Sequence, residues 1–253
     1  MNFGLSCINT YVEGILRGED KEKLRREIIE RAEKQSFDTS LPQKLTEEIK
    51  GALISLGYSV VDVTGRVDYK AISGLSEGLF HLIFEVGINY DEILDVPYIP
   101  GSTIKGVLRS NLYELTGDEG NEIFGDKERE GFVIVSDAYP IGEKRGEKEN
   151  RGEKLFVGDI VNPHYYQGGK PVRTEYDVNP VPILHLAIKE DVKFRFLIGV
   201  DKRAKLGKIG EKLNVRNAVE LVSLLLLYSM KTGLGARSTK GYNFFEVERM
   251  EVK

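Results

Sequence analysis

The C-terminal quarter of the chain decides the fold class. It contains VKFRFLIGV at residues 192–200, VRNAVELVSLLLLYSM at 215–230, GLGARSTKG at 233–241 and YNFFEVERMEV at 242–252. Residues rich in β-branched and aromatic side chains predict strands over 192–200 and 242–252. Apolar residues at three- and four-residue spacing predict a helix over 215–230, which the following glycines end. This segment is therefore a strand–helix–strand unit.

A similar unit is predicted earlier in the chain. The dense apolar run LFHLIFEVGI at residues 79–88 predicts a strand, and FVIVSDAY at 132–139 predicts another. Between them, Ile104, Leu108 and Leu112 form the apolar stripe of a helix. The order β-α-β, a long insert, then β-α-β predicts an α+β, ferredoxin-like fold, with an antiparallel sheet and two helices on one face. The other face of that sheet is expected to be free to bind a ligand.

The rest of the chain adds helices ahead of this fold. Residues 17–35 and 46–56 have apolar side chains at helical spacing and predict two helices. We therefore expect residues 1–57 to form a helical N-terminal region packed on the same domain, and residues 58–253 to form the ferredoxin-like domain.

Composition narrows the classes of function. Of 253 residues, 41% are apolar and 30% are charged, which predicts a folded core. The net charge is −4, but the segment from Lys193 onward holds 13 basic and 6 acidic residues, so a nucleic-acid surface should draw on that segment. A single cysteine, Cys7, excludes an internal disulfide, and no metal-ligand spacing is present, so no cofactor is expected. Without a signal-peptide pattern or a long apolar run, we expect a cytoplasmic protein with no membrane partner.

The loop 233–241 is the first candidate binding site. Gly233, Gly235 and Gly241 flank Arg237 and Lys240. Glycine-rich loops let backbone N–H groups approach phosphates, but the nucleotide-binding fingerprints run strand, loop, helix, whereas this loop follows a helix. The pattern predicts a loop that offers amides and two cations to a phosphodiester chain. An elaborate helix C-cap with surface charges explains the same residues equally well.

The segment PGSTIKGVLR at residues 100–109 is the second candidate. Pro and Gly predict a turn, and Ser102 or Thr103 is expected to cap the helix that follows. Lys105 and Arg109 then lie on one helical face close to the positive end of the helix dipole, which favours a phosphate contact. Two solvated cations on a polar helix face are the commoner outcome of such a pair.

Two segments predict long loops. Residues 142–154 repeat Gly-Glu-Lys, and residues 162–182 are rich in proline, glycine and tyrosine without periodicity. The second segment mixes stacking side chains and cations, as single-stranded nucleic acid sites do, in Tyr165, Tyr166, Tyr176, Lys170 and Arg173. A protein partner, or folding of the loop onto its own domain, accounts for the same residues.

Three motifs together resemble a known family. YIPGSTIKGVLRS (98–110), DIVNPHYY (159–166) and GLGARSTKGYNFF (233–245) occur in this order. They resemble the RAMP superfamily of CRISPR proteins, and within it the sixth-subunit family of type III-B (Cmr) effector complexes. The resemblance covers residues 58–253. Asn243 departs from it, because it stands where the terminal loop usually has glycine, and residues 17–56 do not align.

The resemblance implies an RRM-related, ferredoxin-like fold and a role in antiviral defence. It implies a non-catalytic structural subunit that binds guide RNA near the 3′ end of that RNA. The other implied partners are target RNA as a second candidate, sibling RAMP backbone subunits and a small helical subunit. The positions implied to face RNA or a neighbouring subunit are Lys105, Arg109, Gly233, Gly235, Arg237, Lys240 and Gly241.

Two alternatives to this role remain. Some RAMP proteins are endoribonucleases that process CRISPR repeat RNA, and here His164 would serve as the general acid/base. The other alternative is a protein-only scaffold whose basic residues do not contact RNA.

Overall fold

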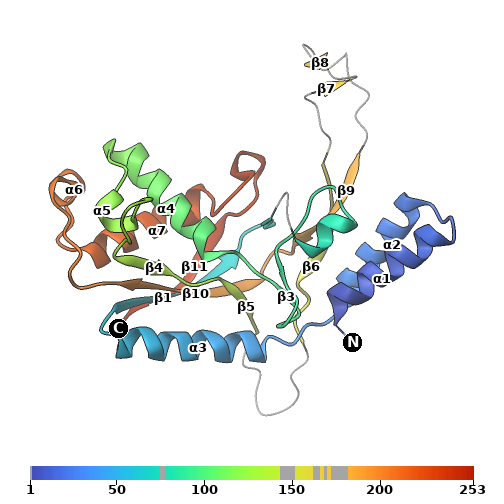
Figure 1. Ribbon diagram of the computed structural model, residues 1–253, viewed down its shortest axis with the longest axis horizontal. Helices are drawn as coiled ribbons and strands as arrows, with labels where there is room; N and C mark the ends of the chain where they lie inside the picture. Colours follow the sequence, from blue (N-terminus) through green and yellow to red (C-terminus); the bar gives the residue numbers. More distant parts are fainter. Residues whose placement is uncertain (1, 75–77, 143–151, 162–165, 168–169, 172–181) are drawn as a thin grey trace.

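The computed structural model describes residues 2–74, 78–142, 152–161, 166–167, 170–171 and 182–253, and Figure 1 shows how they are arranged. The helices are α1 (Phe3–Leu16), α2 (Lys21–Lys34), α3 (Ser40–Ser55), the 3₁₀ turn η1 (Leu79–Leu82), α4 (Gly101–Thr116), α5 (Asn121–Phe124), α6 (Lys208–Leu213), α7 (Ala218–Thr232) and the 3₁₀ turn η3 (Ser238–Lys240). The strands are β1 (Ser59–Val67), β2 (Tyr90–Asp91), β3 (Val96–Pro97), β4 (Val133–Val135), β5 (Tyr139–Ile141), β6 (Phe156–Val161), β7 (Tyr166–Gln167), β8 (Lys170–Pro171), β9 (Ile183–Ile188), β10 (Lys193–Val200) and β11 (Phe245–Val252).

The main sheet is antiparallel, with the strand order β11-β1-β10-β4 and with β5 also paired to β10. α4 lies between the first two of these strands in the chain, β1 and β4, and α7 lies between the last two, β10 and β11. Both helices lie on the same side of the sheet (Figure 1). This is the split β-α-β arrangement. The predicted α+β class with an antiparallel sheet is confirmed, as is the C-terminal strand–helix–strand unit.

The prediction of a strand over residues 79–88 is wrong, and the first strand of the sheet is β1. The residues from Leu79 to Leu82 form a 3₁₀ turn that follows Gly78 at φ +100°. Phe80 in this turn is buried against Tyr90 and Phe156, with ring centroids 5.1 and 6.3 Å away. Periodicity cannot separate a buried turn from a strand within a short apolar run, which explains the error.

The strand predicted over residues 132–139 is divided into β4 and β5. Residues 136–138 leave the ladder between them, and Ser136 Oγ accepts a hydrogen bond from the backbone N–H of Leu197 at 2.9 Å. The interruption directs Asp137 toward the start of α4, where an unbroken strand would not place it.

The N-terminal region is helical, as predicted, with α2 and α3 at the expected places and α1 in addition. α1 and α2 pack on each other, and α2 packs on the second antiparallel sheet, which pairs β6 with β9. α3 instead packs on β1 and β10 of the main sheet. The division of the chain at residue 57 stays a prediction.

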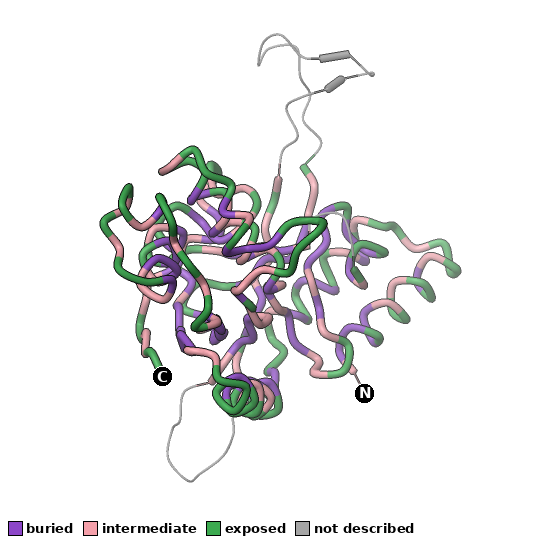
Figure 2. The backbone as a smooth tube through the Cα atoms, turned by 60° about the vertical axis from the view of Figure 1, so that its left-hand side comes forward, coloured by how far each residue is buried: buried purple, intermediate pink, exposed green. Residues whose placement is uncertain are grey.

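The sheet face opposite α4 and α7 is covered by α3, so the prediction of a free binding face is wrong (Figure 1). Leu53 of this helix packs with Val60 and Leu197 in an apolar cluster. With helices on both faces, β1 and β10 are buried along nearly their whole length, as the purple segments of Figure 2 illustrate. RNA therefore cannot stack across this sheet as it does on an open RRM sheet.

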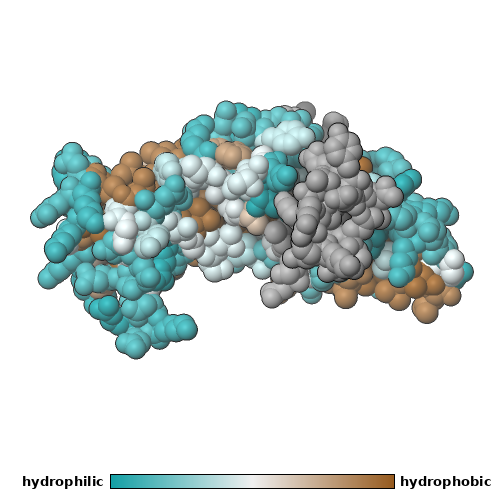
Figure 3. Space-filling view, turned by 90° about the horizontal axis from the view of Figure 1, so that it is seen from above, coloured by the Kyte–Doolittle hydropathy of each residue, from teal (hydrophilic) through white to brown (hydrophobic). Residues whose placement is uncertain are grey.

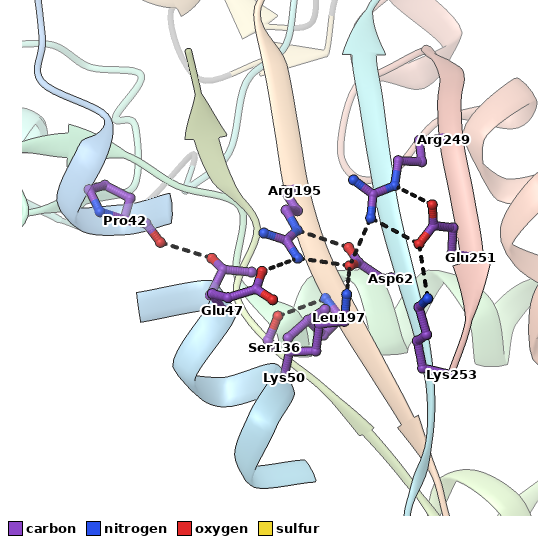
Figure 4. Close-up of polar contacts among 11 residues, drawn as sticks. Pro42, Glu47, Lys50, Asp62, Ser136, Arg195, Leu197, Arg249, Glu251 and Lys253 are labelled. Atoms are coloured by element: carbon purple, nitrogen blue, oxygen red, sulfur yellow. Dashed lines mark hydrogen bonds and ion pairs between the residues drawn. The ribbon is translucent and has the colours of Figure 1, made fainter. Parts of the chain in front are cut away.

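A buried ion cluster holds α3 on the sheet (Figure 4). Asp62 of β1, 1% exposed, accepts hydrogen bonds from Lys50 Nζ at 2.6 Å and from Arg195 Nε at 2.9 Å. Arg195 also donates to Glu47 of α3 at 2.7 Å. Burial by itself would raise the pKa of Asp62, but the hydrogen bonds from Arg195 and Lys50 outweigh burial and lower this pKa to about 2. The cluster therefore links α3, β1 and β10 with its buried charges compensated.

Replacing Asp62 by asparagine should lower the free energy of unfolding by about 3–5 kcal/mol, because Lys50 and Arg195 would stay buried without their counter-charge. The matched control is Glu251→Gln, which removes an exposed partner of Arg249 and should cost less than about 1 kcal/mol. Urea unfolding of both variants measures the difference. Equal losses in the two variants would contradict a structural role for the cluster.

The same cluster predicts a pH dependence of stability. Folding lowers the pKa of Asp62 from 3.8 to about 2, so its stabilisation is present above the ordinary value and is lost as the pH falls through the folded value. Wild-type stability should therefore fall more steeply over this acid range than that of Asp62→Asn. Parallel melting-temperature curves would show that Asp62 contributes nothing to acid unfolding.

Candidate nucleic-acid interface

The glycine loop 233–241 lies directly against the start of α4. Gly233, Gly235 and Gly241 have φ angles of +110°, +142° and +89°, which disfavour other residues. A Cβ placed on Gly235 would lie 3.6 Å from Thr103 Cγ2. The start of the second motif therefore contacts the glycine loop, although more than a hundred residues separate the two in the chain.

The start of α4 is capped from outside its own sequence. Neither Ser102 nor Thr103 caps it, so that prediction is wrong; Asp137 Oδ1 accepts the N–H of Gly101 at 2.7 Å instead. A Cβ on Gly101 would lie 2.3 Å from the carbonyl oxygen of Val135, so only glycine allows this approach. The carboxylate lies at the positive end of the helix dipole, which it stabilises.

A buried hydrogen bond joins the two helices that carry the motifs. Asn111 Nδ2 of α4 donates to Ser229 Oγ of α7 at 2.7 Å, and this hydroxyl donates to the carbonyl oxygen of Leu225, also at 2.7 Å. Ser229 lies in the last turn of α7, just before Gly233. The glycine loop therefore leaves a helix end that is fixed relative to α4.

Asn243 holds the other end of the loop. It is 1% exposed and adopts a left-handed conformation at φ +65°. Its side chain accepts the N–H of Ile72 and donates to the carbonyl oxygen of Ala236, both at 2.8 Å. Its backbone pairs with Lys70 and Leu234. Asparagine tolerates this backbone conformation, so the departure from the family's glycine keeps the turn and adds two hydrogen bonds.

The two cations of the loop have no ion-pair partner within the described ranges. Lys240 is exposed at the end of η3. Arg237 is half-buried at φ +61°, and its Nη1 atom is buried without a hydrogen-bond partner among the described residues. A buried guanidinium nitrogen without an acceptor lowers the stability of the fold.

Lys105 and Arg109 lie on one face of α4, as predicted, but this face meets their own chain. Lys105 Nζ donates to the carbonyl oxygen of Val133 at 2.8 Å, and burial followed by the nearby Arg109 lowers the pKa of this lysine. Arg109 donates to the carbonyl oxygen of Gly125 at 3.1 Å and to Asn121. The structure does not bring them into the loop's surface, and an RNA contact by either residue stays a prediction.

A partly buried polar junction lies where the glycine loop meets the β6–β9 sheet. Asp159 Oδ2 accepts a hydrogen bond from Tyr242 at 2.5 Å and forms an ion pair with Lys70 at 3.1 Å. Burial would raise the pKa of Asp159, but its hydrogen bonds, led by that from Tyr242, outweigh burial and lower it. His185, opposite Asp159 in the ladder, is fully buried, and burial lowers the pKa of this histidine, so it is neutral at pH 7.

The C-terminal basic excess does not form a single patch. Among the described residues, six of its cations are paired with carboxylates of the same chain: Lys193 with Glu248, Arg195 with Asp62, Arg203 with Asp201, Arg216 with Glu220, and both Arg249 and Lys253 with Glu251. Of the predicted RNA-facing cations in this segment, Arg237 and Lys240 are left for an external partner.

Several predicted features lie outside the described residues. These are His164, Tyr165, Tyr176, Arg173 and most of the loop 142–154. Within the described part of the chain, no group of three or more His, Cys, Asp or Glu side chains is placed to hold a metal ion. No described helix is long and apolar enough to cross a membrane.

Sequence reasoning missed the residues that position the loop. Asn243 had a detectable signal, since an asparagine just after a glycine-rich turn often adopts a left-handed conformation. Asp137, Lys70 and Asp159 had none, because each meets its partner through tertiary folding.

Comparisons with known proteins agree with these motifs. The RAMP superfamily model matches residues 83–246. The CRISPR system subunit Cmr6 of Saccharolobus solfataricus is 38% identical over 236 residues, which is 92% of this chain and 74% of that protein. Cmr6 of Pyrococcus furiosus is 28% identical over 286 residues, covering 86% of this chain and 78% of that protein.

A solved structure also matches over most of the chain. It is a chain in the cryo-EM structure of the type III-B Cmr-beta complex bound to cognate target RNA. The TM-score is 0.72 at 35% sequence identity, covering 92% of this chain and 75% of that one.

Replacing Asn243 by alanine should destabilise the protein by about 2–4 kcal/mol, because the N–H of Ile72 loses its acceptor and alanine is strained at a positive φ. Asn243→Gly keeps the backbone conformation and should cost less. Unfolding midpoints, together with amide hydrogen exchange over residues 233–241, measure both effects. If the glycine variant is the less stable of the two, the left-handed backbone is not the constraint.

Proposed function

The chain belongs to the RAMP superfamily and within it to the Cmr6 subunits of type III-B CRISPR effector complexes, and from this premise we propose that it is a non-catalytic structural subunit that binds guide RNA near the 3′ end of that RNA. The observation that carries the proposal is the fixed glycine loop, whose two cations have no ion-pair partner in the part of the chain that the structure describes.

The geometry of the loop suits a phosphodiester chain. Asn243 fixes the loop at one end, and the start of α4 supports it at Gly235, so little ordering is needed when a ligand binds. Lys240 offers an exposed positive charge, and the half-buried Arg237 adds a second positive charge to the same loop. Because α3 covers the opposite face of the sheet, the proposal places RNA on the side of the loop.

The partners that we propose for this chain are based on its membership of the Cmr6 subunits. The related solved complex contains target RNA in addition to the Cmr subunits. We propose that this chain contacts guide RNA directly and sibling RAMP subunits at its flanks, with target RNA and a small helical subunit as further partners. Lys105 and Arg109 would then support the loop by fixing α4 to β4 and α5.

The endoribonuclease alternative rests on His164, outside the described residues. His185 cannot replace it, because a fully buried imidazole cannot reach a phosphodiester. Incubation with a CRISPR repeat transcript in EDTA tests this alternative. Cleavage that disappears in His164→Ala would replace the non-catalytic role by an enzymatic one.

Charge reversal at the loop should weaken RNA binding in the assembled complex. Lys240→Glu and Arg237→Glu should each lower the affinity by about tenfold and reduce the slope of log affinity against log salt by about one, because one phosphate contact is lost. Filter binding over a salt series measures both quantities.

Lys44→Glu is the matched control. It reverses an exposed charge on α3, on the other side of the sheet, and should leave affinity and slope nearly unchanged. Lys240 is exposed, so its variant should fold even if Arg237→Glu does not. Wild-type affinity in Lys240→Glu and in a folded Arg237→Glu would refute the assignment of the loop.

A further inference from the structure

An exposed aromatic side chain lies beside the glycine loop. Tyr69 follows β1 and is 55% exposed. The residues around Tyr69 pair with the backbone that follows the loop. The N–H of Asp68 donates a hydrogen bond to the carbonyl oxygen of Phe244 at 3.0 Å, and the N–H of Asn243 donates one to the carbonyl oxygen of Lys70 at 2.9 Å. Lys70 also forms a bridge with Tyr242, the residue after Gly241. Tyr69 is thus held next to the loop by backbone pairing.

A fixed cation covers one side of the Tyr69 ring. Lys70 Nζ lies over the ring, 4.9 Å from the centroid, and Asp159 holds this nitrogen through an ion pair of 3.1 Å. Burial would lower the pKa of Lys70, but contacts led by the hydrogen bond to Asp159 outweigh burial and raise it, so the cation–π contact persists at neutral pH. The ring is therefore pre-oriented, while about half of the residue stays exposed to solvent.

The surroundings of Tyr69 distinguish a nucleobase from a protein partner. Its chain neighbours Asp68 and Lys70 are both charged, and Arg237 and Lys240 are on the adjoining loop. Among the described residues of 66–74 and 233–244, no other large apolar side chain is exposed. Protein interfaces form around apolar cores, whereas single-stranded nucleic acid uses an aromatic side chain among cations.

Figure 3 views the side of the molecule on which the loop lies in Figure 1. The central part of this face is mostly pale, without a broad brown patch, while brown patches appear toward both ends. Pale marks residues of intermediate hydropathy, so the central part of this face carries no broad apolar patch for a protein partner.

We propose that Tyr69 is a base-stacking residue of the RNA site, so that one nucleobase stacks on its exposed surface while neighbouring phosphates contact the loop 233–241. The inference rests on the proposed function and extends it: the site holds a single strand by stacking as well as by charge. Stacking tolerates any base, so the contact adds affinity without sequence preference.

The contributions of base stacking and of positive charge to RNA binding can be measured separately. Fluorescence anisotropy of a labelled oligouridylate with the full chain, over a salt series, reports both the affinity and the salt slope. Tyr69→Leu should lower the affinity by about tenfold, the effect of one lost stack, with the salt slope unchanged. Tyr69→Phe keeps the ring and should bind like the wild type. Lys240→Glu should instead reduce the slope.

A second measurement uses the same oligonucleotide with single abasic positions. One abasic position should weaken wild-type binding about as much as Tyr69→Leu does, and should cause no further loss in that variant. Tyr69 is exposed, so Tyr69→Leu should melt at the wild-type temperature, which excludes misfolding as the cause.

The outcomes separate the two proposals. If Tyr69→Leu binds RNA like the wild type while Lys240→Glu binds weakly, stacking is refuted and the RNA-binding function stands. If Tyr69→Leu binds RNA normally but no longer co-purifies with sibling Cmr subunits, Tyr69 contacts protein and stacking is again refuted. If neither variant changes binding, the assignment of the RNA site to the loop 233–241 falls together with stacking.

Discussion

The buried charge of Asp62 is the constraint on which the arrangement of the molecule depends. A carboxylate in the middle of the central strand is tolerable only with cations at hydrogen-bond distance, and Lys50 and Arg195 supply them at 2.6 and 2.8–2.9 Å. Because Lys50 belongs to α3, this helix must lie on the same face of the sheet as Asp62. One face of the sheet is thereby closed, and binding is left to the loops on the other side.

The glycine loop is then a fixed surface rather than a flexible connection. Its start follows the α7 turn held by Ser229, and its end is fixed by Asn243. Binding a strand to a pre-ordered loop avoids much of the entropy cost that a mobile loop would incur. The junction of Lys70, Asp159 and Tyr242 extends this order to the neighbouring Tyr69 and to the β6–β9 sheet. Positive charge and an aromatic ring are thus presented together.

Local sequence patterns predicted a helix or strand correctly where the residues of that element alone determine its structure. The apolar stripe of Ile104, Leu108 and Leu112 identified α4, and Gly117, which ends this helix, is left-handed at φ +72°. The run at residues 79–88 was misleading, because most of its apolar side chains are buried although none of its residues belongs to a strand. The cap of α4 was missed because Asp137 reaches it from a break in a strand 36 residues away.

Residue types at short spacing were enough to predict the C-terminal strand–helix–strand unit, the glycine loop and the family. Only the tertiary structure decided which face of the sheet is closed, that Lys105 and Arg109 donate to their own chain, and that Tyr69 lies beside the loop. The physical reason is that ion pairs and hydrogen bonds join residues far apart in the chain. Whether a charged side chain is satisfied internally or left for a ligand depends on those distant partners.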